Sequence, residues 1–391
     1  MVKLKGRDFT IAYIIMSNTQ FKINSFDCNS IFYIIETNIL LECCIMHLES
    51  LEIDHSSSYG PDYEPVSSVM SIDDVYALID ADKLEVDNVI RTRLHSDVVL
   101  VNQLSHYIIN SGGKRLRPIL LLLSARAFAY KGYHHIPLAA VVEFIHTATL
   151  LHDDVVDASD MRRGRDTANA IWGNEASVLV GDFLYSRAFQ MMVEVGSMPV
   201  MDILASSTNV IAEGEVMQLM NCHEPNTTEE TYLEVIRYKT AKLFEAATKL
   251  GAVISGRSEE EIDAMSRYGM HLGTAFQLID DVLDYSHSSE EIGKNVGDDL
   301  AEGKPTLPLI YVMRHGNSEQ VKIVRESIEK GGRDNIDAVI EAVLSTGAID
   351  YTANAAKREA EKAISFLDVL PDSQYKQAMI TLAKFSVNRS Y

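Results

Sequence analysis

EFIHTATLLHDDVVD (residues 143–157) carries an Asp-Asp-x-x-Asp cluster at the end of an apolar run, and GTAFQLIDDVLD (residues 273–284) repeats the arrangement. Apolar residues spaced three and four apart are typical of an α-helix. Residues four apart share a face of a helix, so the outer aspartates of each cluster point the same way. These outer pairs are Asp153 with Asp157 and Asp280 with Asp284.

The gathering of aspartates on apolar helices predicts a metal site. Like charges brought together there are unfavourable unless a cation joins them. Mg²⁺ suits such a site because it prefers oxygen ligands and leaves room for waters and phosphates. A single cluster is more often a solvated acidic face or a helix end. Two clusters, each preceded by a strongly apolar run (Phe144–Leu151 and Thr274–Ile279), instead favour a site that binds a diphosphate through several magnesium ions.

From Ser71 onward the chain predicts one helix after another. Apolar residues recur at three and four positions, as in Val75, Leu78 and Ile79. Alternating strand patterns with Asn-Gly or Asp-Gly turns are missing. Breaks that contain Gly or Pro separate segments of roughly 15–30 residues, the length of bundle helices. We therefore expect one all-α domain over residues 71–391.

The composition of the chain excludes several classes of function. The 391-residue chain is 47% hydrophobic, enough for a sizeable core, and its formal charge of −21 argues against a nucleic-acid partner. An anionic substrate must then be attracted by local lysines, arginines and metal ions. The cysteines show no paired spacing, which indicates a reducing compartment and no zinc site. No apolar run reaches the ~18 residues of a membrane span.

The first 70 residues differ from the remainder. They contain an Ile/Phe/Tyr/Asn-rich stretch followed by a loop-like segment at His55–Pro65. Neither a secretory signal nor a mitochondrial transit peptide matches this composition. We expect residues 1–70 to be a poorly ordered extension, or the product of a start assigned upstream of Met70.

Three groups of cationic residues accompany the aspartates. The first lies in GGKRLRP (residues 112–118), where glycines and a helix N-terminus favour the approach of an anion. Lys114 and Arg117, three residues apart, are expected to share a face. A surface turn is the plainer interpretation of this loop. The second group, Arg162 and Arg163, follows the first aspartate cluster, and its adjacent side chains diverge toward different anions.

The third group comprises Lys239 and Lys304, which could equally be solvated, as lysines usually are. His146 lies seven residues, or two helical turns, before Asp153, so it falls on the aspartate face. A histidine in an apolar helix is otherwise most often a core residue. Gln277 precedes the second aspartate cluster on the same predicted helix.

With these motifs in family order, the chain resembles the trans-isoprenyl (polyprenyl) diphosphate synthases. The shared motifs cover about residues 71–391 and are GGKRLRP (112–118), LLHDDVVDASDMRRG (150–164), YKTAKLF (238–244), GTAFQLIDDVLDY (273–285) and GKNVGDDLAEGKPTLPL (293–309). Within the family the chain most resembles the bacterial octaprenyl diphosphate synthases, through EFIHTATLLHDDVVDASDMRRG and NVIAEGEVMQLMN. The first 70 residues depart from this pattern. The resemblance implies a catalytic domain over 71–391, an all-α bundle of the isoprenoid-synthase type around a central cavity.

The resemblance also implies a role for each motif residue. Magnesium ions would be held by Asp153, Asp157, Asp280 and Asp284, with support from Asp154 and Asp281 behind them. The allylic diphosphate would be bound by Arg162, Lys239 and Lys304. Isopentenyl diphosphate would be bound by Lys114, Arg117, His146 and Arg163. Catalytic roles would fall to Lys239, Thr240 and Gln277, of which the last two line the gap where cationic charge develops.

The implied activity is Mg²⁺-dependent chain elongation. The allylic C–O bond ionises, the double bond of isopentenyl diphosphate attacks, and a proton is lost. Positive charge stabilises the leaving diphosphate, and no side-chain nucleophile is required. Short-chain members of the family place bulky aromatics at the positions of Ala148 and Thr149, both small here, so we expect all-trans-octaprenyl diphosphate (C40) for a quinone side chain. Helical core, rather than a deeper channel floor, is the expected role of Phe183, Phe189, Met191 and Met192.

Other interpretations belong to different classes. A synthase of another chain length, such as C20, C45 or C50, is the nearest. A class I terpene cyclase would need no second set of basic groups for a diphosphate, and a non-catalytic regulatory subunit would lack one aspartate cluster. The resemblance further implies a homodimer. We expect a cytoplasmic enzyme that is primed by farnesyl diphosphate and touches the membrane surface only transiently.

Overall fold

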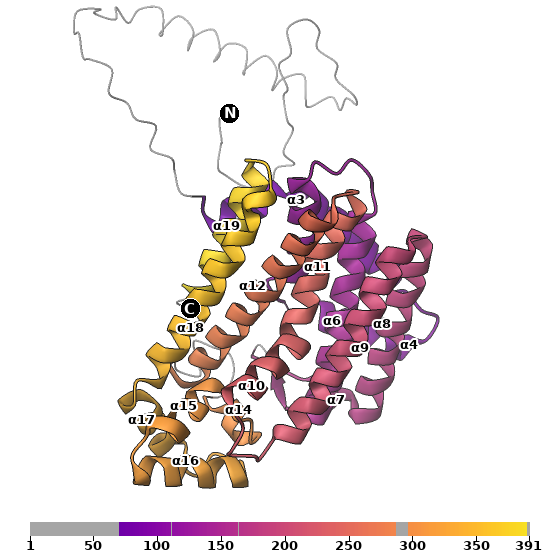
Figure 1. Ribbon diagram of the computed structural model, residues 1–391. Coiled ribbons are helices and arrows are strands. Elements are labelled where there is room, and N and C mark those ends of the chain that lie inside the picture. Colours follow the sequence, from indigo (N-terminus) through magenta and orange to yellow (C-terminus); the bar gives the residue numbers. More distant parts are fainter. Residues whose placement is uncertain (1–69, 111, 163, 287–295, 389–391) are drawn as a thin grey trace, which may run out of the picture. The chain divides into compact units, whose positions relative to one another are not determined.

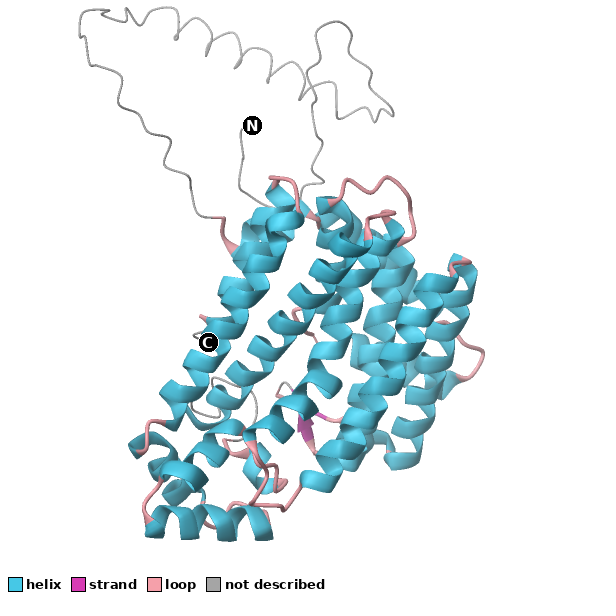
Figure 2. Cartoon of the chain, in the orientation of Figure 1, coloured by secondary structure: helices cyan, strands magenta, loops and turns pink. Residues whose placement is uncertain are grey.

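The part of the chain that the structure describes is almost wholly helical, which confirms the all-α class. The computed structural model describes residues 70–388 except 111, 163 and 287–295. Figure 2 shows helices throughout these ranges, with a short pair of strands among them. The extension expected at the N-terminus lies, up to residue 69, outside the described residues.

Long helices run side by side through the bundle (Figure 1). They are α5 (Leu116–Ala127), α6 (His135–Val156), α8 (Asn174–Val195), α9 (Met198–Asn221), α11 (Lys242–Ile254), α12 (Glu259–Ser286) and α18 (Ala348–Ser365). Further elements before and between them are α2 (Ile72–Leu78), α3 (Asp80–Arg93), α4 (Val99–Asn110), α7 (Ala168–Trp172), α10 (Glu229–Ile236) and the π-helical turn η1 (Arg237–Ala241). The elements gathered at one end of the bundle are α14 (Asp298–Ala301), α15 (Leu307–His315), α16 (Ser318–Lys330) and α17 (Ile336–Ser345). A 3₁₀ turn, η2 (Phe366–Val369), leads into the last described helix, α19 (Gln374–Val387).

A small hairpin follows α6. Strand β1 (Met161–Arg162) pairs antiparallel with β2 (Arg165–Asp166). Sequence patterns did not predict this pair, because two residues per strand are too few to show alternation. Gly164 in its turn has φ +71°, a left-handed conformation that glycine adopts at little cost. The hairpin places Arg162 beside Asp154, near the end of α6.

Helix α6 is buried along most of its length and forms the centre of the main core. Phe144, Ile145 and Leu151 have no exposed surface, and neither has Ala148. A helix that is apolar nearly all round must be covered on all sides, and α6 packs against α3, α5, α8 and α11. Each large apolar side chain buried in this way contributes about 1.5–3 kcal/mol to folding. The aspartates at the end of α6 are therefore held on a rigid element.

Two glycines allow α12 to approach α11 and η1 closely. A Cβ atom on Gly273 would lie 2.6 Å from Ala241 Cα, and one on Gly269 would lie 2.5 Å from the carbonyl oxygen of Phe244. No larger residue fits at either position without moving the neighbouring helix. Gly273 lies one turn before Gln277, so this close contact sets the distance between Gln277 and η1.

The carboxylate of Glu359 joins α18 to α12 through His271 and predicts a pH-dependent stability. His271 Nδ1 lies 2.6 Å from Glu359 Oε2, and Lys362 Nζ donates to Glu359 Oε1 at 2.8 Å. Burial alone would raise the pKa of Glu359, but its hydrogen bonds with His271 and Lys362 lower it from 4.5 to about 2. A depressed carboxyl pKa stabilises the fold above the unfolded-state value. This contribution is lost as the pH falls from about 5 toward 2.

We therefore expect Glu359→Gln to lower the free energy of unfolding by about 2–3 kcal/mol at pH 7. The difference from the wild type should already be about 1 kcal/mol smaller at pH 4. Urea unfolding at both pH values measures this change. The exposed Glu361 provides the control substitution Glu361→Gln, which should alter stability little at either pH. An equal difference at pH 7 and pH 4 for Glu359→Gln would contradict the prediction.

Within the described ranges, no helix is both long enough and apolar enough to cross a membrane.

Candidate active site

A large cavity of about 650 Å³ opens between α5, α6, α9, α10, α11 and α12. Both aspartate clusters and the three groups of cations contribute to its wall. The charged and polar lining residues predicted from the sequence are Lys114, Arg117, His146, Asp153, Asp157, Arg162, Lys239, Thr240, Gln277, Asp280, Asp281, Asp284 and Lys304. Apolar side chains, including Leu150, Ile211, Leu243, Phe244 and Phe276, complete it. Segments far apart in the sequence thus share one space.

The first aspartate cluster is divided as its helical spacing predicts. Asp153 and Asp157 line the large cavity and are partly exposed. Asp154 has no exposed surface, because it lies on the core side of α6. His146, two turns earlier, also lines the cavity. The prediction that His146 lies on the aspartate face is therefore confirmed.

The side chains of the second aspartate cluster are less exposed to solvent than those of the first. Asp280 lines the cavity and is partly exposed, whereas Asp281 is 1% exposed and Asp284 is 8% exposed. Asp284 accepts hydrogen bonds of 3.3 Å from the backbone N–H groups of Asp298 and Asp299. These residues begin α14, so one carboxylate of the cluster also satisfies a helix N-terminus.

Lys239 connects the first aspartate cluster to α9. Its Nζ lies 3.6 Å from Asp153 Oδ2 and donates to Glu215 Oε2 at 2.5 Å. Burial raises the pKa of Glu215 to about 7, although the neighbouring Lys239 opposes this rise. Burial also disfavours the charge on Lys239, and the carboxylates outweigh it and raise the pKa of the lysine. An ammonium group is thus held beside Asp153.

Lys304 holds the matching place beside Asp157. Its Nζ donates to Asp157 Oδ2 at 2.9 Å and pairs with Glu302. Burial disfavours this charge, but Asp157 and Glu302 raise the pKa of Lys304. With its amide oxygen facing the two lysines, Gln218 accepts from Lys239 Nζ at 3.3 Å and from Lys304 Nζ at 3.2 Å. The side-chain amide oxygen of Gln218 thus contacts both lysines.

The donor set of the cavity fits Mg²⁺. Among the described residues, no group of three or more His, Cys, Asp or Glu side chains is already arranged around a single point. Asp153, Asp157 and Asp280 nevertheless present partly exposed carboxylates to one cavity that is large enough for waters and phosphates. Mg²⁺ takes one or two carboxylates and completes its shell in this way, rather than requiring a closed protein cage.

Arg162 is held by Asp154. Its Nε and Nη2 atoms each lie 2.7 Å from Asp154 Oδ1. Burial raises the pKa of Asp154 and Arg162 opposes this rise. The prediction that Asp154 supports the site from behind agrees with this contact, because it fixes the guanidinium at the cavity wall. Arg163 lies outside the described residues.

The basic loop reaches the cavity in a different way from the one predicted. Helix α5 begins at Leu116, after Arg115 in a left-handed conformation (φ 46°), so Lys114 precedes the helix. The expectation that Lys114 and Arg117 share a helix face is therefore wrong. Both side chains still line the cavity.

Aromatic rings hold the cations of this loop. Lys114 Nζ lies 5.2 Å from the ring centre of Phe385, and Arg117 Cζ lies 4.6 Å from that of Phe244. Arg117 Nη1 is also 3.0 Å from His146 Nε2. Stacked guanidinium groups are well oriented for bidentate binding of phosphate. Lys114 and Arg117, with His146 beside Arg117, thus form a second cationic wall, separate from Lys239 and Lys304.

A chain of side-chain hydrogen bonds crosses from η1 to α10. Thr240 Oγ1 donates to Gln277 Oε1 at 3.0 Å, and Gln277 Nε2 donates to Asp281 Oδ1 at 2.9 Å. The Tyr232 hydroxyl donates to the other oxygen of Asp281. Lys239 and Thr240 belong to the π-helical turn, a distortion that is frequent at functional sites.

The small residues before Asp153 occupy different environments. Thr149 lines the cavity, whereas Ala148 is completely buried in the main core and does not line it. Met191 and Met192 are buried in the same core, as predicted. Of the two positions expected to limit product length, Thr149 alone faces the space next to the aspartates.

Comparisons with known proteins agree with this site. The model of the polyprenyl synthetase family matches residues 98–344. This chain belongs to the polyprenyl synthetase family. It is 54% identical over 324 residues to the octaprenyl diphosphate synthase of Haemophilus influenzae, covering 83% of this chain and 98% of the relative. It is 45% identical to an all-trans-nonaprenyl-diphosphate synthase of Rhodobacter capsulatus, with 82% and 99% covered.

A solved structure shares the fold of this polyprenyl synthetase. The Caulobacter crescentus polyprenyl synthase, crystallised with calcium and isoprenyl diphosphate, superposes with a TM-score of 0.79. It is 44% identical and covers 82% of this chain and 98% of its own. Enzymes of this family elongate an allylic diphosphate with isopentenyl diphosphate and are generally metal-dependent.

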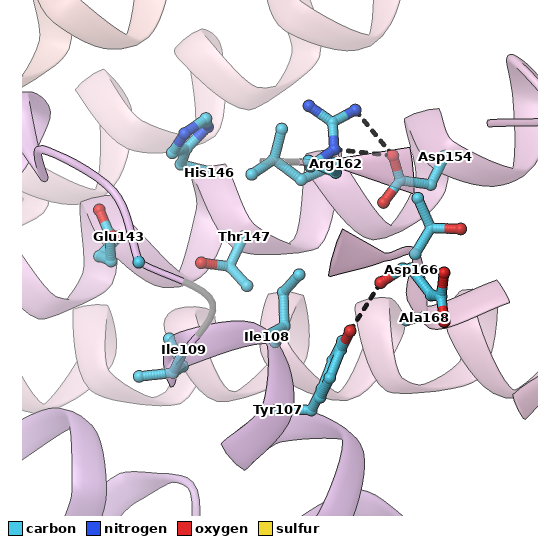
Figure 3. A pocket seen from close by; sticks show the side chains of 13 residues that line it. Tyr107, Ile108, Ile109, Glu143, His146, Thr147, Asp154, Arg162, Asp166 and Ala168 are labelled. Atoms are coloured by element: carbon cyan, nitrogen blue, oxygen red, sulfur yellow. Dashed lines mark hydrogen bonds and ion pairs between the residues drawn. The ribbon is translucent and has the colours of Figure 1, made fainter. Parts of the chain in front are cut away.

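A second, much smaller cavity of about 20 Å³ is also lined by Arg162 and His146 (Figure 3). Tyr107 donates to the backbone oxygen of Asp166 across it at 2.7 Å. Asp154, which holds Arg162, is part of its wall, and Oδ2 of this carboxylate is buried without a hydrogen-bond partner among the described residues. The space is about that of one water molecule and cannot hold a substrate.

Several residues of the family site escaped sequence reasoning. Glu215 and Gln218 lie three apart on α9 within NVIAEGEVMQLMN, where polar side chains interrupt an apolar pattern. The interruption of the apolar pattern by these polar side chains could have indicated from the sequence that they belong to the site. Tyr232 and Glu302 carry no comparable signal, because only packing places them beside Asp281 and Lys304.

Proposed function

We propose that this chain condenses isopentenyl diphosphate onto an allylic diphosphate, with farnesyl diphosphate as primer, to make all-trans-octaprenyl diphosphate. The observation that carries the proposal is one cavity lined by two aspartate clusters and by two separate cationic walls. Two diphosphates need two sets of basic groups, whereas a terpene cyclase needs one. A regulatory subunit would not be expected to keep both clusters.

The two walls divide the substrates between them. Arg162, Lys239 and Lys304 lie beside the first aspartate cluster and would bind the diphosphate that leaves. Lys114, Arg117 and His146 would bind isopentenyl diphosphate, together with Arg163 as the sequence predicts. Charge on the leaving group is stabilised by cations placed in advance in a poorly solvated site.

Mg²⁺ would be bound by Asp153, Asp157 and Asp280, and when bound it supplies Lewis acidity toward the diphosphate oxygens. Asp284 is proposed as a further ligand. It would bind through the carboxylate lone pairs that do not accept hydrogen bonds from the N-terminus of α14. Asp281 would support the site from behind by orienting the side chain of Gln277. The catalytic domain would extend over residues 71–391.

Thr240 and Gln277 would stabilise the allylic cation. Their oxygens lie next to each other on the cavity wall, 3.0 Å apart. A hydroxyl and an amide carbonyl attract positive charge without forming a bond to carbon, as a strong nucleophile would. The double bond of isopentenyl diphosphate can then attack, and the proton lost from it can pass to the departing diphosphate.

The test is an incubation of purified protein with farnesyl diphosphate, excess isopentenyl diphosphate and Mg²⁺, followed by chromatography of the dephosphorylated products. A dominant C40 alcohol that disappears with EDTA supports both the chemistry and the length. A single product of C20, C45 or C50 keeps the enzyme class and changes the length. No elongation by well-folded protein would overturn the proposal.

Thr149→Phe is expected to replace the C40 product by much shorter products. Thr149 lies one helical turn before Asp153 on the cavity wall, and one turn, ~5.4 Å, is about the length of one isoprene unit. A phenyl ring there would leave room for about one isoprene unit between the aspartates and the ring, so a long product could not form. Chromatography of the products measures the shift. The control is Ala148→Phe, which should overpack the core and cost about 1–3 kcal/mol of stability. An unchanged C40 product from Thr149→Phe would place the growing chain elsewhere.

A homodimer is the proposed assembly. Helices α8 and α9 expose large apolar side chains, among them Leu179 (66% exposed), Leu219 (62%) and Met220 (76%). Surfaces of this kind usually bind another protein. Sedimentation of the wild type and of Leu219→Lys tests this assembly, and a wild type that sediments as a monomer would contradict it. We also propose a cytoplasmic location, no nucleic-acid partner, transient contact of the apolar product with a membrane surface, and use of that product as a quinone side chain.

A further inference from the structure

Tyr232 combines an apolar setting with a polar contact to the site. Its ring is 5% exposed and packs in a cluster with Ile236, Leu278 and Leu307. Its hydroxyl donates to Asp281 Oδ2. Packing alone would be satisfied by phenylalanine, so the hydroxyl needs a separate explanation.

Asp281 depends on two hydrogen-bond donors. It is 1% exposed, and among the residues that the structure describes no lysine, arginine or histidine pairs with it. Tyr232 donates to Oδ2, and Gln277 Nε2 donates to Oδ1 at 2.9 Å. With Oδ2 held by the phenol, the carboxylate keeps Oδ1 directed at Gln277. Loss of the phenol would free the carboxylate to rotate.

The direction of these bonds determines the orientation of the Gln277 amide. Gln277 Nε2 donates to Asp281 Oδ1, so the NH₂ group of the amide faces Asp281. The carbonyl oxygen must then face Thr240, whose hydroxyl donates to it at 3.0 Å. If Asp281 rotated away, the amide could turn over and present N–H donors where the carbonyl oxygen had been. N–H donors repel a carbocation.

We propose that Tyr232 is a positioning residue for elongation, which acts through Asp281 to keep the carbonyl oxygen of Gln277 and the Thr240 oxygen directed at the site of cationic charge. The inference rests on the proposed function. It adds to that function a residue that lies on α10, across the cavity from the first aspartate cluster. The substrate diphosphates do not take part in this chain of bonds, so its loss should affect the rate rather than substrate binding.

The test compares the steady-state kinetics of Tyr232→Phe, Gln277→Leu and the double variant. Tyr232→Phe should lower kcat about 10-fold and leave KM for both substrates within about twofold, because a group that acts indirectly should contribute less than the 10²–10³-fold of a direct electrostatic donor. The double variant should be no slower than Gln277→Leu alone, because both changes remove the same function. A purely structural role would give multiplicative losses instead.

Tyr351 provides a matched control. Its hydroxyl donates at 3.0 Å to both carboxylate oxygens of Glu229, which is also on α10, but Tyr351 does not line the cavity. Tyr351→Phe should leave kcat unchanged. An equal loss of kcat in Tyr351→Phe would assign the effect to movement of α10 and overturn the inference. So would a Tyr232→Phe enzyme whose kcat stays within twofold of the wild type.

A second variant covers the case in which Tyr232→Phe does not fold. Asp281→Asn retains an acceptor for Tyr232 and turns its own NH₂ group toward Gln277, which would force the Gln277 amide to turn over. A loss of kcat that is not increased by adding Gln277→Leu supports the inference, and a retained kcat overturns it. If the wild type itself does not elongate, the proposed function fails, and the inference fails with it.

Discussion

Asp153→Asn is expected to lower kcat by about 10³-fold while the protein stays folded. Asp153 is partly exposed at the end of α6, so its carboxylate contributes little to the core. Its loss would remove a proposed magnesium ligand and the partner of Lys239, whose Nζ lies 3.6 Å away. Both effects weaken stabilisation of the leaving diphosphate. Several kcal/mol of transition-state stabilisation depend on such groups.

The measurement is kcat for the first condensation at saturating Mg²⁺, together with thermal unfolding. Asp202 on α9 is exposed and does not line the cavity, so Asp202→Asn matches the change in charge and should retain full activity. An Asp153→Asn enzyme with more than a tenth of the wild-type kcat would show that this carboxylate neither binds the metal nor holds Lys239 in a useful place.

Arg117→Gln is expected to raise KM for isopentenyl diphosphate by about 30–100-fold and to change KM for the allylic diphosphate little. The guanidinium lies over the ring of Phe244 and contacts His146, within the cationic wall assigned to the non-allylic substrate. A charge-assisted, bidentate contact to phosphate is worth about 1.5–3 kcal/mol. Glutamine retains a polar amide on a shorter stem and loses the charge and the planar fork.

The control lies in the last turn of the same helix. Arg126 pairs with Asp82, away from the cavity, and donates through Nε to Asp82 Oδ2 at 2.7 Å. Arg126→Gln should therefore lower stability without changing either KM. If Arg117→Gln raised KM for the allylic diphosphate instead, each of the two substrates would have to be assigned to the opposite cationic wall.

The sequence alone was sufficient to predict the features that depend on local geometry. The spacing of apolar residues predicted the helices, since backbone hydrogen bonds four residues apart impose the same period everywhere. The same period placed Asp153, Asp157 and His146 on one face of α6 and Asp154 on the other. Residue types with matching chemistry, found in family order, were enough to predict a diphosphate site that uses metal ions.

Features that depend on packing between helices were decided by the tertiary structure. Ala148 and Thr149 are neighbours of similar size, yet one is completely buried in the core and the other lines the cavity. Lys114 reaches the cavity from a loop rather than from a helix face, because the left-handed Arg115 delays the start of α5. The sequence contains no signal for the position of Lys114, whereas Thr149 lies four residues before Asp153 and therefore shares its helix face.

Partners distant in sequence were likewise decided only by the fold. Lys304 pairs with Asp157 and Tyr232 with Asp281 because helices from different parts of the chain meet around one cavity. Their separations depend on how closely α12 packs against its neighbours, which the absence of a side chain at Gly273 permits. Helical periodicity determines the face on which a side chain lies. Packing between helices determines which other side chain it meets there.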